Sequence, residues 1–182
     1  MCPTDRHFTT TVLCIRDAVA DDVGALADLA TQLGYPSQPE DMSRRLTALQ
    51  SERSAVLVAL KQDKIVGLVQ VSLEPTMLVE AGATIDALVV DGQHRGEGIG
   101  RALLDAAESW AVNLGCLSMC VRSNIIRQGA HAFYQKRGYV LLKTSLVLTK
   151  ELQNPSYKSK PSEDPQLPDP HVHARPVLPS RQ

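Results

Sequence analysis

Four glycines fall within nine residues in the stretch VVDGQHRGEGIGRALLDAAESWA, residues 89–111, between an expected strand and an expected helix. Glycine loses much conformational freedom on folding, so its repetition here indicates that the backbone must approach something closely. Backbone N–H groups at a helix N-terminus bind phosphate groups, and Arg95 adds a positive charge. We therefore predict that this loop binds the diphosphate of a cofactor.

Two common glycine-rich phosphate sites do not fit this loop. A P-loop ends in Lys followed by Ser or Thr, whereas this loop closes on Gly100 and Arg101. A dinucleotide fingerprint has the spacing G-x-G-x-x-G, whereas Gly96, Gly98 and Gly100 alternate strictly. A nucleotide-binding protein that uses the loop for a different phosphate stays open as an alternative.

A second set of polar side chains lies on the expected helix IRQGAHAFYQKR, residues 126–137. Arg127, His131 and Tyr134 are spaced by four and three residues, which predicts that they share one face of this helix. Phe133 falls on another stripe, which we expect to pack in the core. The phenol of Tyr134 is therefore the candidate for chemistry on this helix.

The elements that must position these groups alternate between strand and helix patterns along residues 11–152. The patterns predict strands over 11–16, 54–61, 64–74, 83–90, 117–123, 139–143 and 145–152, and helices within 17–34, 39–50, 99–114 and 126–137. A short polar turn at Gln62 and Asp63 joins two of the strands as a hairpin. The predicted fold class is α/β, with a mixed, mostly antiparallel twisted sheet flanked by helices.

Composition sets limits on the class of protein. The chain has 182 residues, a net charge of −1 and 43% hydrophobic residues, which predicts one globular domain over residues 1–152. Residues 153–182 are rich in proline and are predicted to be a disordered tail. Interspersed charges argue against nucleic-acid or membrane partners, and the N-terminus lacks a signal-peptide core, so we expect a cytoplasmic protein. No metal site is predicted, and free thiols are expected at Cys2, Cys14, Cys116 and Cys120.

Residues 93–98, Gln-His-Arg-Gly-Glu-Gly, resemble the acetyl-CoA diphosphate loop of the GNAT family of N-acetyltransferases, Q/R-x-x-G-x-G/A after a strand. The stretch AHAFYQKRGY, residues 130–139, is similar to the closing helix of that family. The resemblance implies a GNAT-like fold and transfer of an acetyl group from acetyl-CoA to a primary amine, by direct attack through a tetrahedral intermediate. The cofactor-binding residues that it implies are Leu88, Val89, Val90, Arg95, Gly96, Glu97, Gly98, Ile99, Gly100, Arg101 and Arg127.

The resemblance also implies roles in catalysis. Backbone N–H groups of residues 88–90 polarise the thioester carbonyl if the strand bulges there. Tyr134 corresponds to the general acid that protonates the departing thiolate. Asp86 is the candidate base or water-mediated relay, or else it binds the cationic acceptor. Arg127 stands where the family often has an Asn that bonds the pantetheine arm, and we expect it to make a substitute contact.

The acceptor is the part of the reaction on which the sequence says least. Tyr35 is a candidate wall of the acceptor pocket, together with Asp86. Glu40 and Asp41 follow Pro39 at a helix start, where carboxylates favour the helix dipole, so they are weaker candidates for binding an amine. We expect a small-molecule amine, aminoglycoside-like or other. A peptide or protein lysine or N-terminal amine stays open, as do a non-catalytic acetyl-CoA sensor module and a homodimer.

Overall fold

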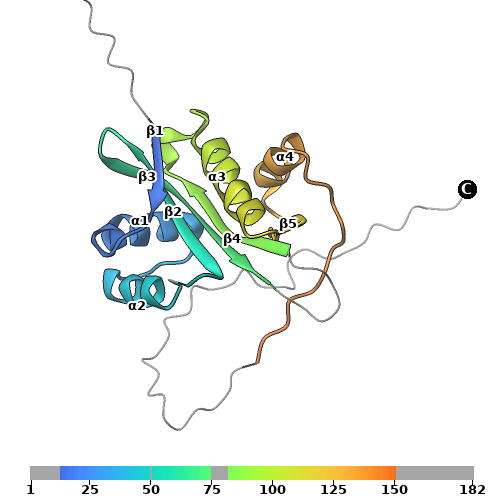
Figure 1. Cartoon of the computed structure of the whole chain (residues 1–182), viewed down its shortest axis with the longest axis horizontal. Helices are drawn as coiled ribbons and strands as arrows, with labels where there is room; N and C mark the ends of the chain where they lie inside the picture. Colours follow the sequence, from blue (N-terminus) through green and yellow to red (C-terminus); the bar gives the residue numbers. More distant parts are fainter. Residues whose placement is uncertain (1–12, 50, 75–81, 151–182) are drawn as a thin grey trace, which may run out of the picture. The chain divides into compact units, whose positions relative to one another are not determined.

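The computed structural model describes residues 13–49, 51–74 and 82–150 (Figure 1). The chain divides into two units, residues 1–139 and residues 140–182. All helices and strands of the described residues lie in the first unit. In chain order they are β1 (Leu13–Asp17), the short helix η1 (Ala20–Asp22), α1 (Val23–Leu33), α2 (Pro39–Leu49), β2 (Ser54–Lys61), β3 (Lys64–Leu73), β4 (Gly82–Val90), η2 (Gly92–His94), α3 (Ile99–Asn113), β5 (Ser118–Val121) and α4 (Gln128–Lys136).

The strands form one five-stranded sheet in the order β1-β2-β3-β4-β5. β1 to β4 pair with their neighbours in antiparallel fashion, and β5 lies parallel to β4 after the crossover through α3. Gln62 and Asp63 form the β2–β3 turn with φ of 50° and 61°, values that tight hairpin turns require. The predicted fold class, a mixed and mostly antiparallel sheet flanked by helices, is confirmed.

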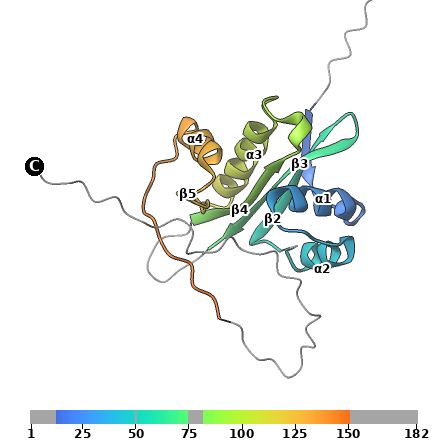
Figure 2. The same cartoon turned by 180° about the vertical axis from the view of Figure 1, so that it is seen from behind.

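Helices cover both faces of the sheet, α3 and α4 on one face and α1 and α2 on the other (Figures 1 and 2). Each face has its own apolar cluster, because strand side chains alternate between the two faces. The α3 face buries Val69, Ile85 and Leu103, and the α1 face buries Leu26 and Val58 among others. These two clusters fix the first turn of α3 and the last turn of α1 beside the carboxyl end of β4.

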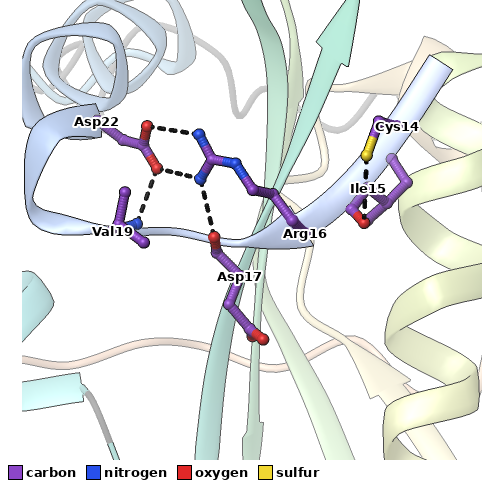
Figure 3. A network of polar contacts seen from close by, with 6 residues as sticks. All are labelled: Cys14, Ile15, Arg16, Asp17, Val19 and Asp22. Atoms are coloured by element: carbon purple, nitrogen blue, oxygen red, sulfur yellow. Dashed lines mark hydrogen bonds and ion pairs between the residues drawn. The ribbon is translucent and has the colours of Figure 1, made fainter. Parts of the chain in front are cut away.

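A polar network holds the connection from β1 to α1 (Figure 3). The Arg16 guanidinium donates to both carboxylate oxygens of Asp22, at 2.6 and 2.9 Å, and the Val19 N–H donates to the same carboxylate at 2.8 Å. Asp22 is only 6% exposed. The bonds from Arg16 hold the pKa of the Asp22 carboxyl below its ordinary value, against the effect of burial. This network fixes where α1 begins.

The two strands predicted over 139–143 and 145–152 are wrong in the described part of these ranges, because residues 140–150 form neither helix nor strand. A strand needs a ladder partner for its backbone groups, and these residues have none among the described ones. Leu146, Val147 and Leu148 are about 90% exposed. Each of the other predicted helices and strands is present. The predicted domain boundary at residue 152 and the proline-rich tail lie outside the described residues.

Candidate functional site

The connection between β4 and α3 is a structured loop of residues 91–98. The Asp91 side chain accepts the N–H of Gln93 at 2.8 Å, and its carbonyl accepts the N–H of His94 at 2.9 Å. Gly96 and Gly98 have φ of 82° and 83°, in the left-handed region that favours glycine. A Cβ built on either glycine would meet no atom within 4 Å. The glycines are therefore required by the backbone conformation, and the space beside them is open.

A run of backbone N–H groups at this loop has no acceptor in the protein. The N–H of Ala102 donates to the carbonyl of Gly98 at 3.1 Å. The N–H groups of the six residues that precede Ala102, residues 96–101, donate to no protein oxygen in the described parts of the chain. Unpaired amides at the N-terminus of a helix attract anions, because they lie at the positive end of the helix dipole. The loop can therefore hold a diphosphate.

Charged side chains surround this run of amides. Arg95 is exposed and makes no ion pair with the described residues, so its guanidinium is available to an anion. Arg101 lies 3.5 Å from Asp105 one turn further along α3. The Glu97 carboxylate contacts Lys61 at 2.7 Å and the ring of His94 at 3.3 Å. These contacts hold the pKa of Glu97 below its ordinary value, and the bond from Lys61 is the main cause.

β4 bulges at Asp86 and not at residues 88–90, so the condition set for three splayed N–H groups there is not met. Gln70 of β3 pairs with Ala87 and Val71 pairs with Ile85, so Asp86 is the extra residue. Residues 88–90 pair regularly with residues 67–69. The physical reason is the core: the bulge changes the phase of the strand, so that Ile85 and Leu88 both pack on the α3 face despite their odd spacing.

Free amides nevertheless occur in this part of β4, because the sheet opens there. β5 pairs with β4 only from Gly82 to Ile85, so later residues of β4 have no strand on that side within the described residues. The Asp91 N–H donates to the carbonyl of Val66 in β3 at 2.9 Å. Alternation along an antiparallel ladder then directs the N–H groups of Leu88 and Val90 away from β3, and that of Val89 toward β3. Two amides, not three, therefore point to the open edge.

Tyr134 is buried, at 8% exposure, and is not on a polar face of α4 as the spacing predicted. Its ring packs edge-on against Phe133 and Tyr139, with ring centroids 5.2 and 5.4 Å away. Burial raises the pKa of Tyr134 to about 12, while the positive charge of Arg127 acts in the opposite direction. Among the described residues its hydroxyl has no hydrogen-bond partner. The phenol is thus protonated at neutral pH and free to donate.

The remaining predicted residues lie in different places. Asp86 is exposed on β4 and accepts a long hydrogen bond of 3.3 Å from the Gln70 amide. Arg127 precedes α4 and donates to the carbonyl of Leu33 at the end of α1, at 2.8 Å. Tyr35 follows α1 and is 63% exposed. No hydrogen bond joins Asp86, Tyr134 and Tyr35 to one another within the described residues.

Two side chains that hold the loop, Lys61 and Gln32, were not predicted from the sequence. The Gln32 amide donates to the Asp91 carboxylate at 3.1 Å and accepts the N–H of Gly92 at 3.0 Å. Both residues are distant from the loop in sequence, so no spacing pattern could have identified them. The Arg122–Glu74 pair was not predicted either; its bonds of 2.6 and 2.5 Å join the residues that follow β5 and β3.

No group of three or more His, Cys, Asp or Glu side chains in the described ranges is arranged to hold a metal ion. None of the helices described is long and apolar enough to span a membrane. Cys14, Cys116 and Cys120 are free thiols, as predicted, and Cys2 lies outside the described residues.

Comparison with known proteins identifies the family. Residues 23–139 match the model of the acetyltransferase (GNAT) family. An aminoglycoside N(6')-acetyltransferase type 1 from Stenotrophomonas maltophilia is 28% identical over 130 residues, covering 69% of this chain and 84% of the relative. A protein from Bacillus halodurans, described as a transcriptional regulator, superposes with a TM-score of 0.70 at 23% identity, covering 76% of this chain and all of the other.

An aminoglycoside N-acetyltransferase solved in complex with CoA superposes with a TM-score of 0.72 at 15% identity, over 80% of this chain and 99% of the other. At 15% sequence identity, this superposition shows that the two proteins share a fold. The family match covers most of the described residues, from α1 to the residue Tyr139 that follows α4. The chain therefore belongs to the acetyltransferase (GNAT) family, and it is an acetyl-CoA-dependent N-acetyltransferase.

Proposed function

We propose that this enzyme acetylates the primary amine of a small molecule, an aminoglycoside or a compound with similar amines. The observation that carries the proposal is the open edge of β4 beyond Ile85, which leads directly into the amide-lined loop. The relative from Stenotrophomonas maltophilia, an aminoglycoside acetyltransferase, supports an acceptor of this class.

The donor is bound first by its diphosphate. The unpaired N–H groups of residues 96–101 and the exposed Arg95 receive the negative charge. The pantetheine arm then follows the open edge of β4, where amides without a strand partner can bond to it. Arg127 binds this arm only if its guanidinium leaves the Leu33 carbonyl or bonds to both.

In the chemical step the amine nitrogen bonds to the acetyl carbon and the carbon–sulfur bond breaks. The N–H groups of Leu88 and Val90 stabilise the negative charge that develops on the carbonyl oxygen. The nitrogen attacks as the neutral amine, after its ammonium form has lost one proton to Asp86 or to water. As the carbon–sulfur bond breaks, the nitrogen loses a second proton to water, Tyr134 protonates the sulfur, and a proton from water restores the phenol. A sulfur that leaves into the same apolar surroundings has a raised affinity for a proton, because burial disfavours the thiolate as it disfavours the phenolate.

The acceptor side is formed around Asp86. Its carboxylate is exposed and makes no ion pair within the described residues, whereas the Glu74 carboxylate pairs with Arg122. An ammonium group is therefore attracted to Asp86, which either takes its proton, directly or through water, or orients it. Tyr35 presents an exposed ring after α1 that can form a wall of the acceptor pocket.

The test measures thiol release from acetyl-CoA over a panel of aminoglycosides, polyamines, free amino acids and lysine peptides. We expect turnover with small amines and little with the peptides. Turnover with lysine peptides alone would refute the proposed acceptor class. Binding of CoA in calorimetry without thiol release from any amine would instead identify a sensor module. A larger thermal shift with ATP or NAD than with CoA would refute the proposed use of the loop.

A further inference from the structure

The diphosphate loop contains a carboxylate at an unfavourable place. Glu97 lies between Gly96 and Gly98, the two residues of the loop with positive φ, and next to the unpaired N–H groups. An ionised carboxylate here repels the negatively charged diphosphate that the loop is proposed to bind. A positively charged group must therefore neutralise the Glu97 carboxylate and hold it away from the diphosphate.

Lys61 meets that requirement from outside the loop. It is the last residue of β2, directly before the hairpin turn, and its Nζ lies 2.7 Å from Glu97 Oε2. His94 contacts the other carboxylate oxygen at 3.3 Å. The Lys61 side chain is 27% exposed and that of Glu97 38%, so the pair is open to solvent, which screens the attraction between the two charges. The carboxylate is thus drawn toward the β2–β3 hairpin.

Gln32 holds the opposite end of the loop. Its amide uses both of its polar atoms, the nitrogen on Asp91 Oδ2 at 3.1 Å and the oxygen on the Gly92 N–H at 3.0 Å. Gln32 lies in the last turn of α1, which is fixed to the sheet by buried side chains such as Leu26 and Leu29. The first residues of the loop are therefore tied to a rigid element.

We propose that Lys61 and Gln32 are positioning residues for acetyl-CoA: Lys61 keeps the Glu97 carboxylate away from the diphosphate, and Gln32 fixes the start of the loop. The inference rests on the proposed use of residues 91–101 for the diphosphate. Neither side chain has to touch the ligand. A loop that is already held in its binding shape loses less conformational entropy on binding, which increases affinity.

The first experiment is a double-mutant cycle on CoA binding, measured by calorimetry. Lys61→Met should weaken CoA binding about tenfold, because it leaves the Glu97 charge uncompensated beside the diphosphate. In a Glu97→Gln background the same Lys61→Met change should alter affinity less than twofold. The matched control is Lys64→Met. Lys64 pairs with Lys61 across the hairpin and makes no ion pair among the described residues. Lys64→Met therefore removes an equal charge from the position next to Lys61.

Three results would overturn the proposal for Lys61. Equal weakening by Lys61→Met with and without Glu97→Gln would show that Lys61 contacts the diphosphate itself. Equal weakening by Lys61→Met and Lys64→Met would show a general charge effect. No weakening by Lys61→Met would show that the loop needs no compensation. Failure of the wild-type protein to bind CoA would refute the proposed site itself, so the two failures are distinguishable.

Kinetics separate positioning from a merely structural role. Lys61→Met should raise the KM for acetyl-CoA and leave kcat at saturation within twofold. With S-acetylpantetheine, which has no diphosphate, the variant and the wild type should have the same KM. Gln32→Met should likewise raise the KM for acetyl-CoA severalfold, whereas Asp28→Met, one turn earlier on α1, should not. A fall in kcat with both donors, or a KM change with S-acetylpantetheine, would refute positioning through the diphosphate loop.

Discussion

Tyr134→Phe is the substitution that tests the chemical step most directly. The ring stays, with its edge-on contacts to Phe133 and Tyr139, and the lost hydroxyl has no hydrogen-bond partner among the described residues. We therefore expect the free energy of unfolding to change by less than about 1 kcal/mol. General acid catalysis is worth about a hundredfold or more in rate, which corresponds to about 2.7 kcal/mol of activation free energy.

The assay is thiol release at saturating acetyl-CoA with an acceptor whose chemical step limits the rate. We expect kcat to fall about a hundredfold while the KM for acetyl-CoA changes less than threefold. Because the pKa of Tyr134 is raised to about 12, the phenol stays protonated over the ordinary assay range. The ratio of wild-type to variant turnover should therefore be the same at pH 7 and pH 9. Turnover near that of the wild type would refute Tyr134 as the proton donor.

Tyr139→Phe provides a control in the same aromatic cluster. The Tyr139 hydroxyl donates to Glu108 at 3.0 Å, so its removal leaves a partly buried carboxylate with one bond fewer. We expect a loss of about 1 kcal/mol in the free energy of unfolding and little change in kcat. Tyr134→Phe should thus lose activity and keep its stability, whereas Tyr139→Phe should lose stability and keep its activity. Equal loss of activity in both would indicate that packing of the cluster, not the Tyr134 proton, controls the rate.

Three further predictions concern other parts of the molecule. Gly98→Val should weaken CoA binding more than tenfold in calorimetry, because a β-branched residue is strained at a φ of 83°; unchanged affinity would remove this loop from the site. Asp22→Asn should lower the free energy of unfolding in urea by about 1–2 kcal/mol at pH 7. The pKa of Asp22 is lowered in the folded state, so this difference should be complete above about pH 4 and vanish as pH falls through the folded pKa; a difference that grows in acid would contradict the assignment. Asp86→Asn should raise the KM for the amine about tenfold with the KM for acetyl-CoA unchanged, and equal effects on both substrates would argue against an acceptor-side role.

Much of the sheet could be predicted because its signals are local. The strand patterns at residues 54–61 and 64–74 and the polar turn between them identified the hairpin, and β2 and β3 begin at Ser54 and Lys64 as predicted. The final strand pair could not be predicted in the same way, since an apolar run such as residues 146–148 becomes a strand only if another strand pairs with it. Spacing likewise placed Tyr134 beside Arg127 and His131 but could not tell which side chains face the core.

At the candidate site, the loop itself could be predicted from the sequence, but the side chains that hold it could not. The glycine pattern predicted residues 96–100 to be a diphosphate loop, and Gly96 and Gly98 do adopt positive φ, a requirement that leaves a trace in residue type. The residues that hold the loop leave no such trace. Lys61 is 36 residues from Glu97 and Gln32 is 60 residues from Gly92, so these contacts exist only once the sheet and α1 have assembled.

The chemistry proposed for the candidate site depends on two backbone irregularities that occur together in β4. The bulge at Asp86 and the end of the β5 ladder at Ile85 are adjacent in sequence. The bulge turns Asp86 outward while Leu88 returns to the core face, and the loss of the ladder leaves the next amides of the strand without partners. The carboxylate proposed to attract the amine, at Asp86, and the N–H groups proposed to bind the carbonyl oxygen, at Leu88 and Val90, thus come from every second residue of one strand. Both groups occur at this place because the bulge lets Ile85 and Leu88 pack in the same core cluster.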